Sequence, residues 1–526
     1  MTTPFKAIGV LALSSLAIAC SSQPDDSLSS FTAECKASVA PVAGEAFIQG
    51  LTFMGTSIAD APFDTSSAEI VQYDACTDKL YVVNAQAKRV DVLSIDDNGA
   101  PTQTAFIDLN SAGEAADVEI GAANSVAVFN GLVAVAIENS DKQANGIVGL
   151  YRSDDLSLLT TFPTGALPDM VGFSKDGRYI ATANEGEPNG DYSVDPEGSI
   201  TLIDLSQGIN QAEVTQIGFN EFDGARKSEL PAGVRISGPN ATVAQDLEPE
   251  YLTFADNGKI YVALQENNAM AIVNPESKSV EKIVGLGEKS WSDSKLDASN
   301  KDKIIGNFKS YPQLVGLYMP DTLDSYSVDG KTYILSANEG DGREYGFKTT
   351  QALCDQAGFK WDEDQAYGAR SFTIWDENGE LVFDSGDDFA TIALMNEGKN
   401  FNSTNDSNDS GDDRSDDKGI EPEAIEVAQI NDRHYAFIGL ERQGGIMIYD
   451  ITDPKQAQFL HYVNRRDYNQ PVCTEVEDGE CANDTYNPKA GDLAPESINY
   501  FARNGQHFIA VGNEVSGTTS VFRIEL

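Results

Sequence analysis

The sequence predicts an all-β protein folded as a seven-bladed β-propeller, and the recurrence of one unit carries that prediction. The unit is a short apolar strand, a turn, a second strand that ends in a polar pair, and a third strand. Asx-Gly turns separate these strands, as they do in antiparallel sheets. Seven units, each of roughly 40 residues or more, are typical of a propeller.

Five of the units share a fixed spacing. Each opens on a Pro-acid dipeptide, and its second strand closes on a glutamate 16, 16, 18, 18 and 18 residues later, in chain order. We call the first set the opening acids and the second the closing acids. The opening acids are Asp169, Glu250, Asp321, Glu423 and Glu496, and the closing acids are Glu185, Glu266, Glu339, Glu441 and Glu514. Two degenerate units precede these five, and they add Glu69 to the opening acids and Glu138 to the closing acids.

The two ends of the chain predict how the ring closes. The last unit ends with its third strand at Ser520–Ile524 and has no outer strand. The segment Ala46–Phe53 precedes the first unit and has no partner of its own. We therefore expect the N-terminal segment to supply the outer strand of the C-terminal blade, which leaves no open sheet edge.

The first residues predict an exported lipoprotein. Residues 1–19 read as a signal peptide that ends in small residues before Cys20, as in a bacterial lipobox; an ordinary secretory signal with a chance Cys is the alternative. Residues 20–43 form a polar tether and residues 44–526 a single propeller domain with long insertions. Ser21 after Cys20 favours the outer membrane or cell surface, although the leaflet and a periplasm-facing position stay open.

The charge of the chain excludes some partners. Asp and Glu number 83 against 36 Lys and Arg, a formal net charge of −47. This balance excludes nucleic acid as a partner, because binding phosphates requires clustered Lys and Arg. It also opposes electrostatic docking on anionic lipid, so we expect membrane contact only through the lipid anchor.

Five cysteines remain after Cys20, and export permits disulfides among them. Cys473 and Cys481 bracket a short polar loop that a disulfide would close. Cys35 could pair with Cys76, which would leave Cys354 over. Because five is an odd number, at least one thiol is free or pairs elsewhere.

Several unusual strings resemble the choice-of-anchor I family. They include Ala183–Pro188, Ala337–Asp341, Arg414–Gly419 followed by Glu421–Glu423, and Ala510–Thr518. The resemblance covers about residues 45–526 and implies a secreted or surface-attached, propeller-like protein whose anchor varies between members. Members are often labelled alkaline-phosphatase-like, and Arg343 also fits the family pattern. Ala494 departs from it, since two other units carry Glu248 and Glu421 at that position.

The repeated acids predict metal binding. First strands of propeller blades line the central channel, so the opening acids would form a ring at one mouth, broken only by Ser125. Carboxylates converging there repel one another unless they bind cations or take up protons, and oxygen ligands suit Ca²⁺ or Mg²⁺. With the acidic insertion 402–418 included, the predicted ligands, Ca²⁺ foremost, are Glu185, Glu250, Glu339, Asp416, Asp417, Glu423 and Glu496. The alternative is structural: each acid caps a neighbouring blade, and the insertion is a solvated acidic loop.

Phosphoester hydrolysis would also require a cation that grips phosphate. Arg343, Arg414 and Lys418 lie within acidic strings and are the candidates for that role, unless they are satisfied ion pairs. Two functions therefore stay open. The first is a surface-anchored, metal-dependent hydrolase of small phosphate esters. The second is a non-enzymatic adhesion or binding propeller for an extracellular ligand, with structural calcium.

Overall fold

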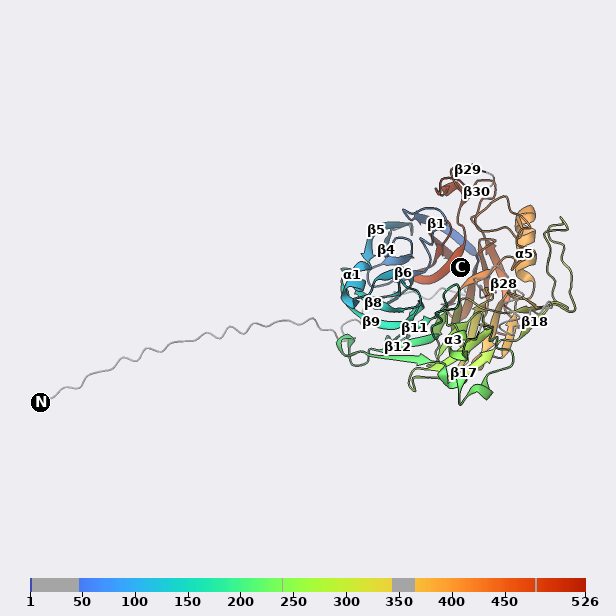
Figure 1. The fold of residues 1–526 in the computed structure, drawn as a ribbon. Coiled ribbons are helices and arrows are strands. Elements are labelled where there is room, and N and C mark those ends of the chain that lie inside the picture. Colours follow the sequence, from blue (N-terminus) through green and yellow to red (C-terminus); the bar gives the residue numbers. More distant parts are fainter. Residues whose placement is uncertain (2–46, 239, 343–364, 478–479) are drawn as a thin grey trace.

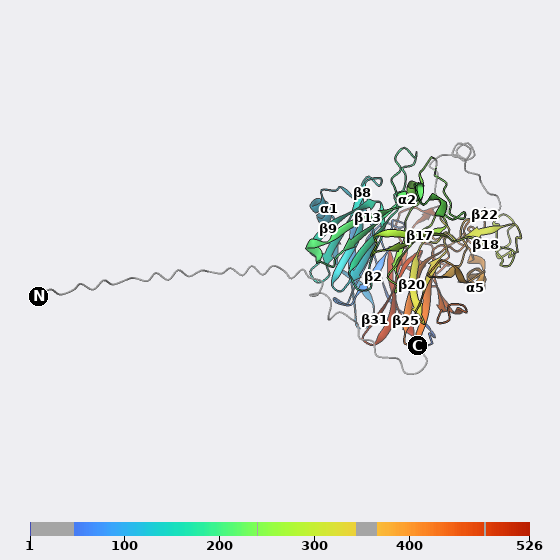
Figure 2. The same ribbon diagram turned by 90° about the horizontal axis from the view of Figure 1, so that it is seen from below.

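The chain folds as a ring of seven four-stranded antiparallel sheets, the seven-bladed β-propeller that the sequence predicts. The computed structural model describes Met1 and residues 47–238, 240–342, 365–477 and 480–526. The blades follow one another around the ring in chain order (Figures 1 and 2). The predicted signal peptide and tether lie outside the described residues and stay predictions.

Blades one to four each use four successive strands. Blade one contains β2 (Val71–Asp74), β3 (Lys79–Asn84), β4 (Arg89–Ile95) and β5 (Pro101–Asp108). Blade two contains β6 (Ile120–Phe129), β7 (Leu132–Asn139), β8 (Asn145–Arg152) and β9 (Leu158–Ala166). Blade three contains β10 (Pro168–Phe173), β11 (Tyr179–Asn184), β12 (Ser199–Asp204) and β13 (Glu213–Gly218). Blade four contains β14 (Leu252–Phe254), β15 (Ile260–Leu264), β16 (Ala269–Asn274) and β17 (Ser279–Gly285).

The last three blades complete the ring. Blade five contains β20 (Leu323–Val328), β21 (Lys331–Ala337), β23 (Phe372–Asp376) and β24 (Leu381–Asp384). Blade six contains β25 (Pro422–Ile430), β26 (Arg433–Leu440), β27 (Ile446–Asp450) and β28 (Gln458–Val463). Blade seven contains β31 (Pro495–Arg503), β32 (Gln506–Asn513), β33 (Thr518–Glu525) and β1 (Gly50–Ile58).

The ring closes through the two ends of the chain, as predicted. β1 pairs antiparallel with β33, from Gly50 opposite Glu525 to Ile58 opposite Thr518. In Figure 1 the blue β1 therefore lies beside the red C-terminal strands. The strand starts and ends a few residues later than the sequence pattern indicates. The pairing continues past a register shift between Phe53 and Gly55, so the strand extends beyond its predicted end.

The core lies between neighbouring blades. Middle strands such as β3 and β26 are buried along almost their whole length, which explains why they read as apolar runs and not as alternating strands. Between blades six and seven, Tyr435, Phe437 and Ile448 pack in one cluster with Ile509 and Phe522. Each sheet thus buries one face against the preceding blade and the other face against the following blade.

The insertions leave from one face of the propeller, because each follows a second strand or precedes a first strand. They hold short helices and minor sheets: α2 (Asn220–Asp223), α3 (Val243–Asp246), α5 (Asp388–Glu397), β18 (Glu288–Ser290), β19 (Val315–Leu317), β22 (Gln365–Ala366), β29 (Val476–Glu477) and β30 (Glu480–Cys481). A further helix, α1 (Asn110–Ala116), joins blades one and two. The sequence pattern assigns residues 206–245 and 275–310 to insertions, and the structure shows that both insertions begin later. The outer strands β13 and β17 occupy the first parts of these ranges, and their half-buried residues do not give the apolar runs of the inner strands.

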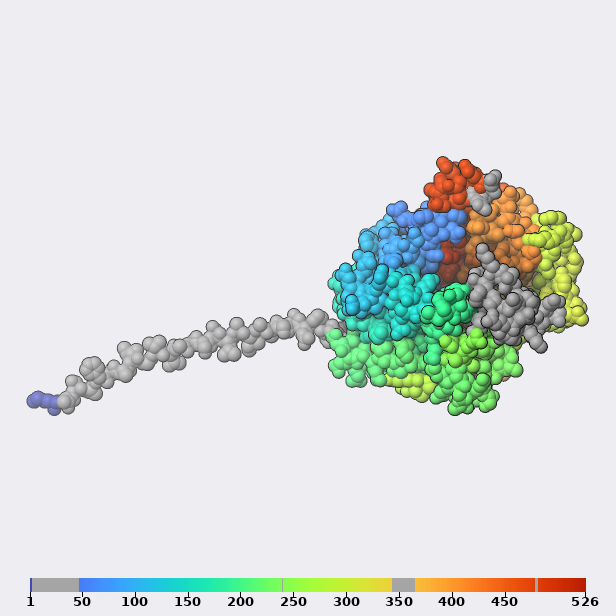
Figure 3. Space-filling model, in the orientation of Figure 1, coloured from blue at the N-terminus to red at the C-terminus, as the bar shows by residue number. Residues whose placement is uncertain are grey.

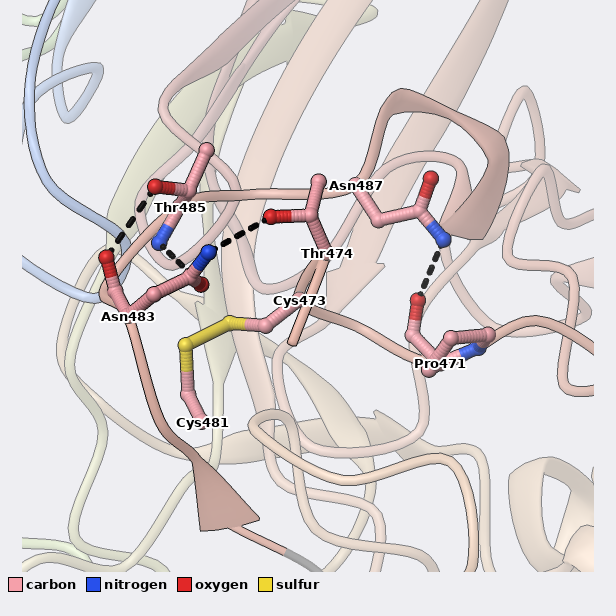
Figure 4. The surroundings of a disulfide bond; sticks show 7 residues. All are labelled: Pro471, Cys473, Thr474, Cys481, Asn483, Thr485 and Asn487. Carbon is pink, nitrogen blue, oxygen red and sulfur yellow. Dashed lines mark hydrogen bonds between the residues drawn. A yellow bond between two sulfur atoms is a disulfide. The ribbon is translucent and has the colours of Figure 1, made fainter. Parts of the chain in front are cut away.

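The last insertion projects from the rim of the ring, where it forms the orange-red protrusion at the top of Figure 3. A disulfide joins Cys473 to Cys481 across it, with a Cα–Cα distance of 5.5 Å. Beside the disulfide, Asn483 Nδ2 donates a hydrogen bond to Thr474 Oγ1 (Figure 4). Cys76 is disulfide-bonded too, while Cys35 and Cys354 fall outside the described ranges. In the part of the chain that the structure describes, the helices are too short or too polar to cross a bilayer.

Candidate functional site

The opening and closing acids meet at one end of the channel because backbone bonds hold the two ends of each repeat together. The N–H of Glu441 donates to the carbonyl of Glu421, 2.8 Å away, and the N–H of Glu514 donates to Ala494, also at 2.8 Å. Glu421 and Ala494 both have positive φ, 50° and 58°, directly before a proline. The departure at Ala494 therefore keeps the backbone geometry and loses only the carboxylate.

Four opening acids line one cavity in the channel. Its volume is about 120 Å³, and Glu69, Asp169, Asp321 and Glu496 are in its wall. Burial raises the pKa of Asp169 to about 7, and the nearby Glu138 adds to the shift. Crowded carboxylates in a restricted space resist ionisation in this way. The structure thus brings four of the six opening acids to one cavity.

Several closing acids are tied into the scaffold, as the structural interpretation of the repeat expects. Glu138 Oε1 accepts a hydrogen bond of 2.9 Å from the backbone N–H of Ala122. Glu514 accepts one of 2.5 Å from Ser66, which lies at the entrance to blade one. Such bonds link neighbouring strands and blades, so these glutamates have structural partners.

Among the residues that the structure describes, three sets of three carboxylates converge at this mouth, and in each set one oxygen per residue lies within 4.8 Å of the others. The channel cluster contains Asp321, Glu423 and Glu496, one from each of blades five, six and seven. The cation-paired cluster contains Glu339, Glu421 and Glu441. The blade-four cluster contains Glu185, Glu250 and Glu266, of which the first belongs to blade three.

The cation-paired cluster is neutralised by basic side chains of the same chain. Lys418 Nζ lies 2.8 Å from Glu339 and 3.2 Å from Glu421. Arg442 Nε lies 3.1 Å from an oxygen of Glu421, and Arg414 also pairs with this glutamate. Burial alone would raise the pKa of Glu421, but the three cations outweigh burial and hold that pKa below its usual value. The cluster is a buried ion-pair network.

The three acids of the channel cluster show the opposite electrostatics to Glu421. Within the described ranges, no lysine or arginine forms an ion pair with any of its three acids. Burial raises the pKa of Glu423 well above its usual value, and the neighbouring Glu441 and Glu496 raise it further. The pKa values of Asp321 and Glu496 are raised well above the ordinary range for the same reasons, burial first and nearby carboxylates second.

Those predicted catalytic and metal-binding residues that the structure describes do not form one site. Arg414 and Lys418 lie in the ion pairs of the cation-paired cluster, and Arg343 falls outside the described residues. Asp416 pairs with Lys301 at 3.2 Å, and Asp417 pairs with Arg414 at 2.7 Å; both carboxylates lie in the insertion 402–418. The other predicted ligands are distributed over the three clusters.

Two residues at this mouth, Asp321 and Arg442, are not among the predicted metal ligands or phosphate-binding cations. Asp321 belongs to the opening acids, and the repeat register that selects Glu423 and Glu496 selects it as well. Arg442 follows the closing acid Glu441 directly, and no pattern in the sequence marks its contact with Glu421, 21 residues away. The contact arises only when the end of one strand folds back on the start of another.

Sequence comparison identifies a family likeness across most of the chain. The profile of the choice-of-anchor I domain matches residues 69–357 and 348–454. The mesenchyme-specific cell surface glycoprotein of Strongylocentrotus purpuratus is 33% identical over 138 residues, which is 24% of this chain and 18% of that protein. Gigasin-3a of Magallana gigas is 29% identical over 173 residues, which is 31% of this chain and 58% of that protein. The chain thus matches less than two thirds of the length of either relative.

Solved structures with similar architecture share little sequence with this chain. The β-propeller domain of Cps50 (Swd1) from Myceliophteria thermophila has a TM-score of 0.46 at 7% identity and covers 89% of this chain and 100% of that one. Hydrazine synthase of Kuenenia stuttgartiensis has a TM-score of 0.47 at 11% identity, with coverage of 91% and 99%. Neither likeness bears on function.

Proposed function

The chain belongs to the choice-of-anchor I family, and on that premise we propose that it is an exported, surface-attached binding propeller without hydrolytic activity. Its extracellular ligand would meet the face that carries the insertions. The name of one relative, a cell surface glycoprotein, supports the location. The expected lipid anchor at Cys20 supports it as well.

One observation carries the choice between a binding module and a hydrolase: two of the cations predicted to grip phosphate are already engaged. Lys418 contacts Glu339, Asp341 and Glu421, and its side chain is only 11% exposed. Freeing its ammonium for a phosphate would take a cation away from the buried Glu339 and Glu421, which costs on the order of 2 kcal/mol. Arg414 is held in the same way by Glu421.

The distribution of the acids supports the same choice. A two-metal phosphoesterase requires its carboxylates within one site, with metal ions about 3.5–4 Å apart. Here Glu185, Glu339 and Glu423 belong to three different clusters, and the insertion residue Asp416 pairs with Lys301. Acids divided among clusters on different blades and a broad face of insertions are what the binding-module hypothesis expects.

Hydrolysis of p-nitrophenyl phosphate by the purified mature chain tests this proposal directly. We expect no turnover above the buffer blank with Ca²⁺, Mg²⁺ or Zn²⁺ present, and no change after EDTA. Metal-dependent turnover that Lys418→Gln abolishes, but Lys301→Gln preserves, would overturn the proposal in favour of a phosphoester hydrolase.

The surface location has its own test. We expect the wild-type protein to fractionate with cell membranes and a Cys20→Ser variant to be released in soluble form. Recovery of both proteins in the same soluble fraction would remove the lipid anchor from the proposal.

A further inference from the structure

We propose that Asp321, Glu423 and Glu496 bind one calcium ion at the channel mouth and thereby join blades five, six and seven. This site goes beyond the proposed function, since it would hold whether or not the insertion face binds a ligand. Each carboxylate comes from the opening position of a different blade. The ion would therefore act as a staple across three repeats.

The spacing of the oxygens fits calcium. One oxygen from each residue lies within 4.8 Å of the other two. For three such oxygens there is always a point within about 2.8 Å of all of them, close to the 2.3–2.6 Å of calcium–oxygen bonds. Magnesium requires about 2.0–2.1 Å in a nearly ideal octahedron, a stricter geometry than the flexible coordination that calcium accepts. Water molecules in the channel would supply the remaining ligands.

One carboxylate of this cluster, that of Glu423, has an oxygen without a hydrogen-bond partner among the described residues. Glu423 is only 9% exposed, and its Oε2 is buried without a hydrogen-bond donor among the described residues. A buried carboxylate oxygen in that state carries a desolvation cost that no bond offsets. The charges that bear most strongly on Glu423 are those of other acids, among them Glu441 and Glu496. A divalent cation would satisfy this oxygen and remove the repulsion together.

The side chains nearby do not supply that cation. The charge of Glu423 contributes to the raised pKa of Arg442, but the guanidinium of Arg442 is bonded to Glu421 and Glu441. Lys418 is held by Glu339 and Glu421. The neighbouring cation-paired cluster thus shows how this protein neutralises three converging carboxylates, and the channel cluster lacks the equivalent from the described part of the chain.

Calorimetric titration of the EDTA-dialysed mature chain with CaCl₂ tests the site, together with thermal unfolding in EDTA and in millimolar Ca²⁺. We expect saturable binding and a higher melting temperature with calcium. Glu423→Gln should weaken the binding about 10–100-fold, or remove one equivalent, and reduce the thermal shift. Glu138→Gln is the matched control, because it makes the same change to an acid of blade two and should leave both readouts unchanged.

Two results would overturn the proposal: no heat and no thermal shift with the wild-type chain, or unchanged binding in Glu423→Gln. If Glu423→Gln does not fold, Glu496→Gln takes its place with the same expected loss. The phosphate-ester assay is independent of these readouts. A failure of the calcium site is therefore distinguishable from a failure of the proposed function.

Discussion

Glu421 and Glu423 are two residues apart on the same Glu-Pro-Glu segment, and their environments are opposite. Glu421 is fully buried among Lys418, Arg414 and Arg442, which hold its pKa below the usual value. Glu423 is buried beside other acids, and its pKa is raised well above the usual value. Burial alone therefore does not decide the charge of a carboxylate at this mouth. The partners delivered by the insertions and strand ends decide it.

The largest expected effect comes from neutralising these two glutamates in turn. Glu421→Gln leaves three buried or half-buried cations without their shared carboxylate and should lower the free energy of unfolding by about 3–5 kcal/mol. Glu423→Gln removes a charge that the fold disfavours, so in EDTA at pH 8 its stability should equal or exceed that of the wild type. Urea denaturation of both variants checks the pair. Equal losses would mean that packing, and not the surrounding charge, governs this segment.

The next largest effect is expected from removing Lys418, the lysine of the cation-paired cluster. Lys418→Gln should lower the free energy of unfolding by on the order of 2 kcal/mol, because Glu339 and Glu421 lose the ammonium between them while Arg414 and Arg442 remain. Millimolar Ca²⁺ should restore part of that loss by entering the vacated position. Lys301→Gln is the control: its side chain is 77% exposed and pairs with Asp416, so it should cost less than about 0.5 kcal/mol. A calcium effect of the same size in both variants would contradict the comparison.

The acidity of the channel predicts a pH dependence of stability in the absence of divalent cations. The pKa of Asp169 rises from an ordinary 3.8 to about 7 in the folded chain. Between these values the folded state holds a proton that the unfolded state releases, so this residue favours folding most at low pH and less as the pH approaches 7. Asp169→Asn should therefore flatten the fall of the melting temperature between pH 4 and pH 8 in EDTA. An unchanged pH profile would show that Asp169 ionises freely in the folded protein.

The repeat register made the fold predictable, and with it the ring of opening acids. The spacing from Pro-acid to Glu recurs because every blade bonds the start of its first strand to the end of its second. β1 was also predictable, because a last blade of only three strands would leave an open sheet edge. The ion pairs of the mouth were not predictable, because Lys418 and Arg442 reach Glu421 through an insertion and a strand end that obey no repeat. From the sequence alone, Arg414 and Lys418 were therefore candidates for binding phosphate. In the structure both pair with acidic residues of the same chain.

The smallest expected effect concerns the acidic insertion 402–418, whose Asp416 and Asp417 the sequence pattern places among the metal ligands. The carboxylates of Asp416 and Asp417 are 36% and 52% exposed and pair with Lys301 and Arg414. Exposed pairs of this kind contribute little, so Asp416→Asn and Asp417→Asn should change the calcium affinity by less than about twofold. The same titration that measures Glu423→Gln provides the scale. A tenfold loss in either variant would mean that the insertion supplies ligands to the channel cluster, and the contrast between an internally neutralised region and a calcium-dependent one would no longer hold.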